Sequence, residues 1–459
     1  MAAATVCMDT VNSLASADSV DTSEPSRPRK PAPKRRYNLY STALAPVMII
    51  LKLTGMGEND FKFWLARYLY NFYFLCLLAL CAGTVYNSYL DTLIIAFRAS
   101  SLSNMMDQYG WWSAELVWLY TLATSLAFLI WAIKWKKINS MAHLLDEADF
   151  TFLHKLEDEK DEFLQKRMRV VCIKSYFMSF FFMTETFVWP ILLYAVKGFK
   201  AKIIIYSLAF IPSLIISLGL ALAFTVYVCT AELWRIYNYS LRKEINRLTT
   251  QNDRSLTNFD IIIARSSDQY DALANLTATV AHIFRYYAIL HALVILSLIT
   301  QIYQTIFDST ASMPFTIYSW VDVICQLTPL FAASTISNHS LRTATSLHNF
   351  YKSYWSSDNN RNRKAAIDIK ISLDFDTMHH QSTGFYTYFY QRVAREDMCV
   401  SIDIAGLLPI TKTTVGALLF AAVNWCAVIM QFRQGSSGTS ADDAVIGNGT
   451  NATNATFSQ

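Results

Sequence analysis

The chain has 459 residues, of which 53% are hydrophobic and 16% are charged, and its mean hydropathy is +0.25. A soluble protein with this balance would be hard to keep in solution, so the composition indicates an integral membrane protein surrounded by the lipid bilayer. The net charge of +4 is too small to indicate nucleic-acid binding, and we expect no nucleic-acid partner.

The eight cysteines are scattered along the sequence without the close pairs of a zinc or redox motif. We therefore expect no disulfide framework, no metal site and no cofactor. No nucleophile constellation, phosphate-binding loop or pair of catalytic carboxylates stands out, so the protein is not expected to be an enzyme.

The amino-terminal segment is polar, contains few aromatic residues and ends in a cluster of Lys and Arg. Such a composition is typical of a disordered segment, and we assign residues 1–43 to a basic cytoplasmic tail. The apolar stretch that follows is short and contains Pro46 and Lys52. This pattern predicts an interfacial helix and linker over residues 44–67 rather than a further span.

Long apolar segments dominate the rest of the sequence. The hydrocarbon core of a bilayer is about 30 Å thick, and about 20 apolar residues in a helix are needed to cross it. Seven segments meet this requirement, namely residues 68–90, 111–133, 175–196, 203–230, 287–307, 315–336 and 413–432. The sequence therefore predicts an all-α membrane protein with seven transmembrane helices, the first six of them within residues 68–336.

The distribution of positive charge predicts the orientation in the membrane. With the amino terminus inside, the cytoplasmic segments hold 33 of the 39 Lys and Arg residues. Because cytoplasmic loops are enriched in these residues, the amino terminus is expected in the cytoplasm and the carboxyl terminus outside. Three lysines in the short loop 197–202 are a local exception.

Glycosylation motifs agree with an extracellular tail over residues 433–459. This tail contains three consecutive Asn-X-Thr motifs, whose acceptors are Asn448, Asn451 and Asn454. Such motifs matter only on the lumenal side, so these three are expected to be glycosylated. The same type of motif also occurs in segments placed in the cytoplasm, at Asn238, Asn275 and Asn338.

Helical patterns continue beyond the cytoplasmic ends of several spans. Residues recur every three or four positions in two stretches, one with Leu341, Ala344, His348, Tyr351 and Trp355 and another with Tyr270, Leu273, Thr277, Val280 and Phe284. Because such a stripe needs a surface to pack against, we expect an intracellular bundle shared between subunits. Residues 337–412 would form its anchor region.

The last span has two different faces when it is drawn at 3.6 residues per turn. One face is small and polar, with Thr413, Ala417, Ala421, Asn424, Val428 and Gln431, and the other is bulky and apolar. An amide facing lipid would be costly, so Asn424 and Gln431 are expected to face protein or water. Helix packing and the lining of a pore both explain this face, and periodicity does not choose between them.

Residues 424–432 resemble the carboxyl-terminal signature of the insect gustatory receptor family, in which a Thr-Tyr pair, five hydrophobic residues and Gln-Phe follow one another. The spacing and the final Gln431-Phe432 match, whereas Asn424 and Trp425 replace the Thr-Tyr pair. The resemblance implies a fold similar to that of insect odorant receptors and a tetrameric, ligand-gated cation channel. The seventh helices would line one central pore, with Asn424, Val428 and Gln431 on the pore side, Gln431 at the extracellular gate and Phe432 behind it.

In that family a pocket among spans two to six, open toward the extracellular side, holds the tastant. Ionisable, amide and Trp side chains at the matching depth are the candidate ligand-binding residues, namely Glu115, Trp118, Glu185, Trp189, Gln301, Trp320, Asp322 and Gln326. An interfacial aromatic belt explains Trp320 equally well, and Glu115 lies near enough to its span end to reach water. For the two deeper acids, structural pairing with Arg285 or His291 is the alternative.

These features together predict a gustatory receptor in the plasma membrane of a chemosensory neuron, acting as a non-selective cation channel that a small-molecule tastant opens. By resemblance it assembles as a homotetramer, or as a heterotetramer with related receptors. A receptor coupled to a G protein is the main alternative and a transporter is the next, although neither the motifs of the former nor the inverted repeat of the latter is evident. A sugar, a bitter compound, carbon dioxide and an internal nutrient are all compatible with the sequence.

Overall fold

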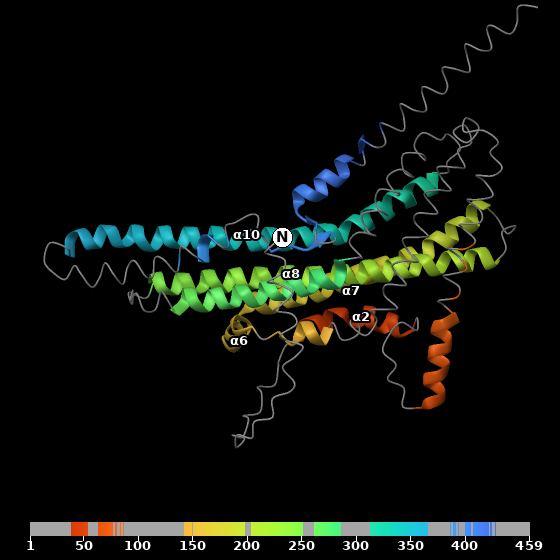
Figure 1. Cartoon of the computed structure of the whole chain (residues 1–459), viewed down its shortest axis with the longest axis horizontal. Coiled ribbons are helices and arrows are strands. Elements are labelled where there is room, and N and C mark those ends of the chain that lie inside the picture. The colour runs from red at the N-terminus through yellow and green to blue at the C-terminus, as the bar shows by residue number, and fades with distance from the viewer. Residues whose placement is uncertain are drawn as a thin grey trace, which may run out of the picture. The chain divides into compact units, whose positions relative to one another are not determined.

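A computed structural model describes residues 38–53, 63–76, 142–148, 150–197, 203–250, 261–285, 313–365, 400–404 and 407–421, with single residues in 79–86, 386–393 and 423–427. The helices labelled in Figure 1 are α2 (Leu39–Leu53), α6 (Thr151–Asp158), α7 (Glu162–Lys197), α8 (Ile203–Thr250) and α10 (Met313–Ala365). The strands are β1 (Asp403–Ile404) and β2 (Leu408–Pro409). Residues 64–76, 261–285 and 412–421 are also helical. Within these ranges the two short strands are the only sheet, so the fold is almost entirely helical, as the sequence predicts.

Three long helices contain the predicted spans 175–196, 203–230 and 315–336. They have 36, 48 and 53 residues, so at about 1.5 Å per residue each is longer than a bilayer core of about 30 Å. α8 and α10 remain helical well beyond the predicted ends of their spans, as the periodicity indicated. α8 packs against both α7 and α10.

The core of the described chain is centred on α8. Nearly every side chain between Leu218 and Leu241 is buried, because this stretch is mostly apolar and is covered by helices on several sides. Among the residues that the structure describes, the segment Ser217–Arg247 alone is long and apolar enough to cross a membrane, and 94% of its most apolar window lies inside the protein. The number of spans and their orientation therefore stay predictions.

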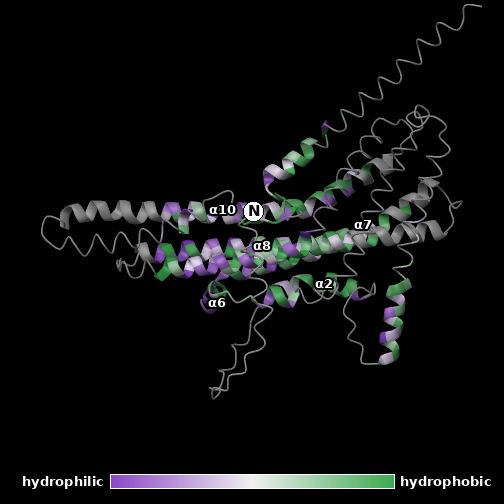
Figure 2. Ribbon diagram, in the orientation of Figure 1, coloured by the Kyte–Doolittle hydropathy of each residue, from purple (hydrophilic) through white to green (hydrophobic). Residues whose placement is uncertain are grey.

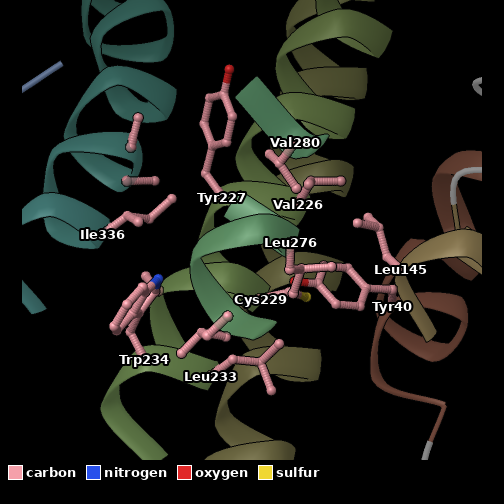
Figure 3. Close-up of a cluster of buried hydrophobic side chains, with 14 of the residues drawn as sticks. Tyr40, Leu145, Val226, Tyr227, Cys229, Leu233, Trp234, Leu276, Val280 and Ile336 are labelled. Carbon is pink, nitrogen blue, oxygen red and sulfur yellow. The ribbon is translucent and has the colours of Figure 1, made fainter. Parts of the chain in front are cut away.

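Trp234 is the largest fully buried side chain and joins α8 to the helix 261–285 (Figure 3). Its indole Nε1 donates a hydrogen bond of 3.0 Å to Thr277 Oγ1, and its ring lies edge-on to Tyr270, 5.2 Å away between centroids. The predicted stripe on this helix is buried at all of its positions, Tyr270, Leu273, Thr277, Val280 and Phe284. That prediction is confirmed.

The prediction of which residues are buried on α10 was partly wrong. His348 is exposed and Leu341 and Ala344 are only half-buried, while Tyr351 and Trp355 have side chains outside the described set. The buried positions are instead Ser337, Ser340, Thr343, Ser346 and Leu347. Their hydroxyl groups find acceptors within α10 or on α8, so small polar residues bring these two helices close together without unpaired donors.

A polar contact on the same face connects α8 to α10. Asn238 Nδ2 donates to the carbonyl of His339 at 2.8 Å, and Thr343 Oγ1 donates to Asn238 Oδ1 at 2.8 Å. Because both ends of this buried amide are engaged, Asn238 is not available to glycosylation in the folded chain. Burial lowers the pKa of the His339 side chain to about 4, and the positive charges of Arg342 and Arg235 act in the same direction.

We expect His339 to make stability depend on pH. A histidine in the unfolded chain takes up a proton near its ordinary pKa of 6.5, whereas His339 in the folded chain stays neutral down to about pH 4. Stability should therefore fall as the pH drops from 6.5 toward 4, because only the unfolded state gains this proton. In thermal unfolding of the detergent-solubilised protein, His339→Gln should lose less stability over this range, and a pH dependence identical to that of the parent would contradict the assignment.

The amino terminus of α2 is fixed by Asp146. The backbone N–H groups of Tyr40 and Ser41 each donate to a different oxygen of this carboxylate at 2.9 Å, and the Tyr40 hydroxyl lies 3.0 Å from Thr230 Oγ1 on α8. The helix begins at Leu39, within the segment that the sequence assigned to the tail. Its buried residues recur at helical spacing and face α7 and α8, namely Leu39, Tyr40, Ala43, Leu44, Val47 and Leu51.

Replacing Asp146 tests how strongly this contact holds α2. Asp146→Ala removes the acceptor for two N–H groups at the start of the helix and should lower the free energy of unfolding by about 0.5–2 kcal/mol. Asp146→Asn keeps one acceptor oxygen and should have a smaller effect. Asp158→Asn, at an exposed carboxylate of α6, is the control. Equal thermal-unfolding midpoints for Asp146→Ala and the parent would show that the contact does not hold α2.

Large apolar side chains remain on the surface of a single chain. Figure 2 shows how apolar residues continue along α7, whose exposed positions include Ile173, Tyr176, Phe177, Phe180, Phe187 and Ile191. The helix 64–76 likewise exposes Trp64, Leu65, Tyr68, Leu69, Phe72 and Leu75. Contiguous apolar surface of this kind is typical of contact with lipid or with another protein.

Candidate functional site

Two acidic side chains selected from the sequence lie together inside the helical core. Glu185 belongs to α7 and Asp322 to α10, and their residues are 8% and 5% exposed. The two helices are in contact, and the carboxyl groups are close enough to interact directly. Burial of a carboxyl group in an apolar region is costly without a partner, so this pair is the first candidate for function.

Gln326 completes the cluster. It lies one turn after Asp322 on α10, and its Nε2 donates to Asp322 Oδ1 at 3.4 Å. Gln326 is 1% exposed, so three of the predicted ligand-binding residues occupy one buried position between two helices. We call Glu185, Asp322 and Gln326 the carboxyl cluster.

Glu185 is the unsatisfied member of the carboxyl cluster. Both of its carboxyl oxygens are buried and lack a hydrogen-bond partner in the geometry of the structure, although the group adjoins Asp322 and the Cys325 thiol. Two adjacent carboxylates in a dry apolar region repel each other strongly. The arrangement offers polar groups to a ligand that could donate hydrogen bonds.

The other predicted residues are distributed differently. Trp320 is 48% exposed, so it does not join the carboxyl cluster and fits an interfacial position better. Trp189 lies on α7, one turn after Glu185, but its side chain is outside the described set. Three further candidates lie outside the described residues, namely Glu115, Trp118 and Gln301.

The sequence offered pairing with Arg285 as a structural explanation for the two buried acids, and the geometry does not support it. Within the described residues no ion pair joins Arg285 to Glu185 or Asp322, and its Nε is buried without a hydrogen-bond partner. His291 lies outside the described part of the chain. Cys325 was not among the residues selected from the sequence, although it adjoins Glu185. Its position three residues after Asp322, on the same side of a helix, was the available signal.

The start of the seventh predicted span is a separate candidate region. Its helix begins at Lys412, after Thr411 Oγ1 accepts a hydrogen bond of 3.1 Å from the Thr414 backbone N–H. The antiparallel strands β1 and β2 precede it, with Ile404 opposite Leu408. Residues 412–421 are helical, and so is Asn424, while the full length of the predicted span stays a prediction.

This helix contacts its own chain along one edge. Val415 is buried, and Leu418, from the predicted bulky face, is half-buried and packs on the core. The small and polar face is exposed at each of its described positions, Thr413, Ala417, Ala421 and Asn424. Val428, Gln431 and Phe432, and the tail acceptors Asn448, Asn451 and Asn454, lie outside the described residues.

Comparison with known proteins gives a structural match and no sequence match. No protein-family model matches the chain, and no curated protein is a significant relative. Among solved structures, the insect olfactory receptor OR5 from Machilis hrabei matches in two forms, one of them in complex with eugenol. Both superpose with a TM-score of 0.55, covering 85% of this chain and 97% of the receptor, at 11% and 12% identity. The chain has the fold of an insect olfactory receptor.

This fold agrees with the expectation from the sequence, which was a similarity to insect odorant receptors reached through the gustatory signature. The match covers nearly the whole of the receptor, so the similarity is not confined to one part of its fold. At such low identity the match defines the fold alone, so the function has to be inferred from the residues themselves.

A double-mutant cycle tests whether the two acids act as a pair. Glu185→Gln and Asp322→Asn each remove one carboxyl group and keep the shape of the side chain. Because each change also relieves the repulsion felt by the other acid, the effects on unfolding free energy should deviate from additivity by about 0.5–3 kcal/mol. Glu185→Gln combined with the distant Asp158→Asn should be additive. Additive effects in the first cycle would mean that the two carboxyl groups do not interact.

Proposed function

We propose that this chain is a chemosensory receptor of the gustatory type, which acts as a ligand-gated, non-selective cation channel opened by a small-molecule tastant. The olfactory-receptor fold supports the chemosensory class, and one of the matching receptors binds eugenol, a small molecule. The carboxyl-terminal motif that ends in Gln431-Phe432 supports the gustatory type.

The observation that carries the channel proposal is the orientation of the seventh helix. Its small and polar side chains are not covered by the chain's own core, whereas Val415 and Leu418 face that core. Lipid is a poor neighbour for Asn424, since its amide would lack hydrogen-bond partners there. A ring of identical helices around water satisfies both facts, with Asn424, Val428, Gln431 and Phe432 forming the pore and its gate.

The carboxyl cluster is the proposed centre of the ligand site. Its acids and amide come from two different helices, so a ligand that hydrogen-bonds to both can favour one relative position of α7 and α10. The remaining predicted candidates, Glu115, Trp118, Trp189 and Gln301, would surround it, while Trp320 would serve as an interfacial anchor. Ligand binding can open the channel only by the difference in affinity between the open and closed states.

Assembly and location follow from the same proposal. A central pore requires several copies, and we propose a homotetramer, or a heterotetramer with related receptors, in the plasma membrane of a chemosensory neuron. The carboxyl-terminal tail would lie outside the cell, with Asn448, Asn451 and Asn454 glycosylated. The apolar surfaces of α7 and of residues 64–76 would face lipid or a neighbouring copy.

Substitutions on the two sides of the seventh helix test the pore. In cells that express the receptor and give a ligand-evoked current, Asn424→Leu and Gln431→Ala should change conductance or relative cation permeability at least about twofold, because each removes an amide from the pore wall. Val423→Leu, at an exposed apolar position next to Asn424, is the control and should leave both quantities unchanged.

Patch-clamp recording of single-channel conductance and of reversal potentials in mixed-cation solutions gives the measurement. Surface labelling shows that each variant reaches the membrane in equal amount. If both amide variants conduct like the parent while Val423→Leu does not, the predicted pore face is wrong. If the parent current requires a G protein, the channel proposal itself is wrong.

A further inference from the structure

A cavity of about 590 Å³ lies between α6, the far end of α8 and the first residues of the helix 261–285. This size is within the range of small-molecule sites, which is roughly 300–1,000 Å³. Its walls share no residue with the carboxyl cluster or with the seventh helix. Under the proposed topology it lies on the cytoplasmic side, whereas the existence of the cavity does not depend on that topology.

The walls of this cavity are mainly apolar. Phe152 of α6 and Tyr237 of α8 meet edge-on, with ring centroids 5.6 Å apart, and Leu241 and Ile261 extend the surface. The Tyr237 hydroxyl donates to the Ser266 carbonyl at 2.8 Å, so its ring is held in place. Ile261 is 52% exposed, which leaves an apolar side chain at a water-accessible wall. Such a wall suits an aromatic or branched aliphatic group.

Charged residues in the lining are balanced in sign. Lys155 of α6 and Glu244 of α8 form an ion pair across the cavity wall, and Arg265 and Asp268 lie on the helix 261–285. Two positive and two negative side chains give no net charge, so neither an anion nor a cation is favoured overall. Gln269, also in the lining, has a buried Oε1 without a hydrogen-bond partner.

Neighbouring ion pairs keep α6 in position as one wall. Lys243 of α8 pairs with Glu159 and Asp161, and Arg247 pairs with Glu159 at 2.8 Å. The hydrogen bonds of Arg247 and Lys243 lower the pKa of the Glu159 carboxyl, so these pairs are present at neutral pH. The cavity is therefore a gap between fixed helices.

We infer that this cavity is a second ligand site, which takes a small amphipathic molecule of zero net charge with an aromatic or branched apolar body and a hydrogen-bond donor. The apolar body would lie against Phe152, Tyr237 and Leu241. Its donor would reach Gln269 or the Glu244 carboxylate. A bound molecule would contact α6, α8 and the helix 261–285 at the same time.

Thiol protection on the detergent-solubilised full chain tests the inference, with indole as the probe because it is neutral, aromatic and carries one N–H donor. Ala264→Cys places a thiol in the cavity lining. Asp158→Cys, at an exposed position outside the lining, is the matched control. N-ethylmaleimide modifies both proteins with and without indole, and mass spectrometry of the peptide that contains each new cysteine follows the rate, separately from the native cysteines.

Saturating indole should slow modification at position 264 at least about fivefold and leave position 158 unchanged, as expected when a ligand fills the cavity. No slowing up to the solubility limit of indole, or equal slowing at both positions, would overturn the inference. Benzoate and benzylamine, which carry net charge, should protect position 264 at least about tenfold more weakly than indole. Equal protection by either would overturn the assigned ligand class. No channel current enters this experiment, so its outcome is separate from that of the pore test.

Discussion

Burial of α8 on several sides is the constraint on which the rest of the described structure depends. α7, α10, α2 and the helix 261–285 all pack on it, and Trp234 is its largest fully buried side chain. Because α8 is mostly apolar over this stretch, its neighbours must cover it with apolar side chains or with small hydroxyl side chains that form hydrogen bonds. Each neighbour that does so is thereby placed at a defined position, including α7 and α10, which bring Glu185 and Asp322 together.

Sequence reasoning succeeded where apolar side chains at helical spacing determine the packing. The stripe from Tyr270 to Phe284 is buried as predicted, because each member is bulky or makes a hydrogen bond across the interface. It failed on α10, where Ser340 and Thr343 form the buried edge and satisfy their hydroxyl groups locally. Hydropathy assigns such residues to the surface, although small hydroxyl side chains pack well between close helices.

In the candidate site, too, some features could be predicted from the sequence and others could not. Individual burial of Glu185, Asp322 and Gln326 was predictable, since charged and amide groups inside apolar segments stand out. The approach of Glu185 to Asp322, Cys325 and Gln326 was not predictable, because it depends on how α7 and α10 pack. Trp320 was selected on its depth in the sequence, yet its rotational position on α10 directs it outward. The cavity beside α6 had no sequence signal, because its lining comes from three separate segments.

The account joins a buried polar cluster between two helices to an exposed polar face on a third, within a fold that insect olfactory receptors share. Its central claim is that copies of this chain form a ligand-gated pore, and the homotetrameric form of the proposal requires no other protein. The most direct measurement is single-channel recording from the purified protein reconstituted in planar lipid bilayers without any other protein, while candidate tastants are applied. The account predicts discrete cation currents whose open probability rises with ligand and which Asn424→Leu alters. Purified, ligand-binding protein that never conducts would contradict it.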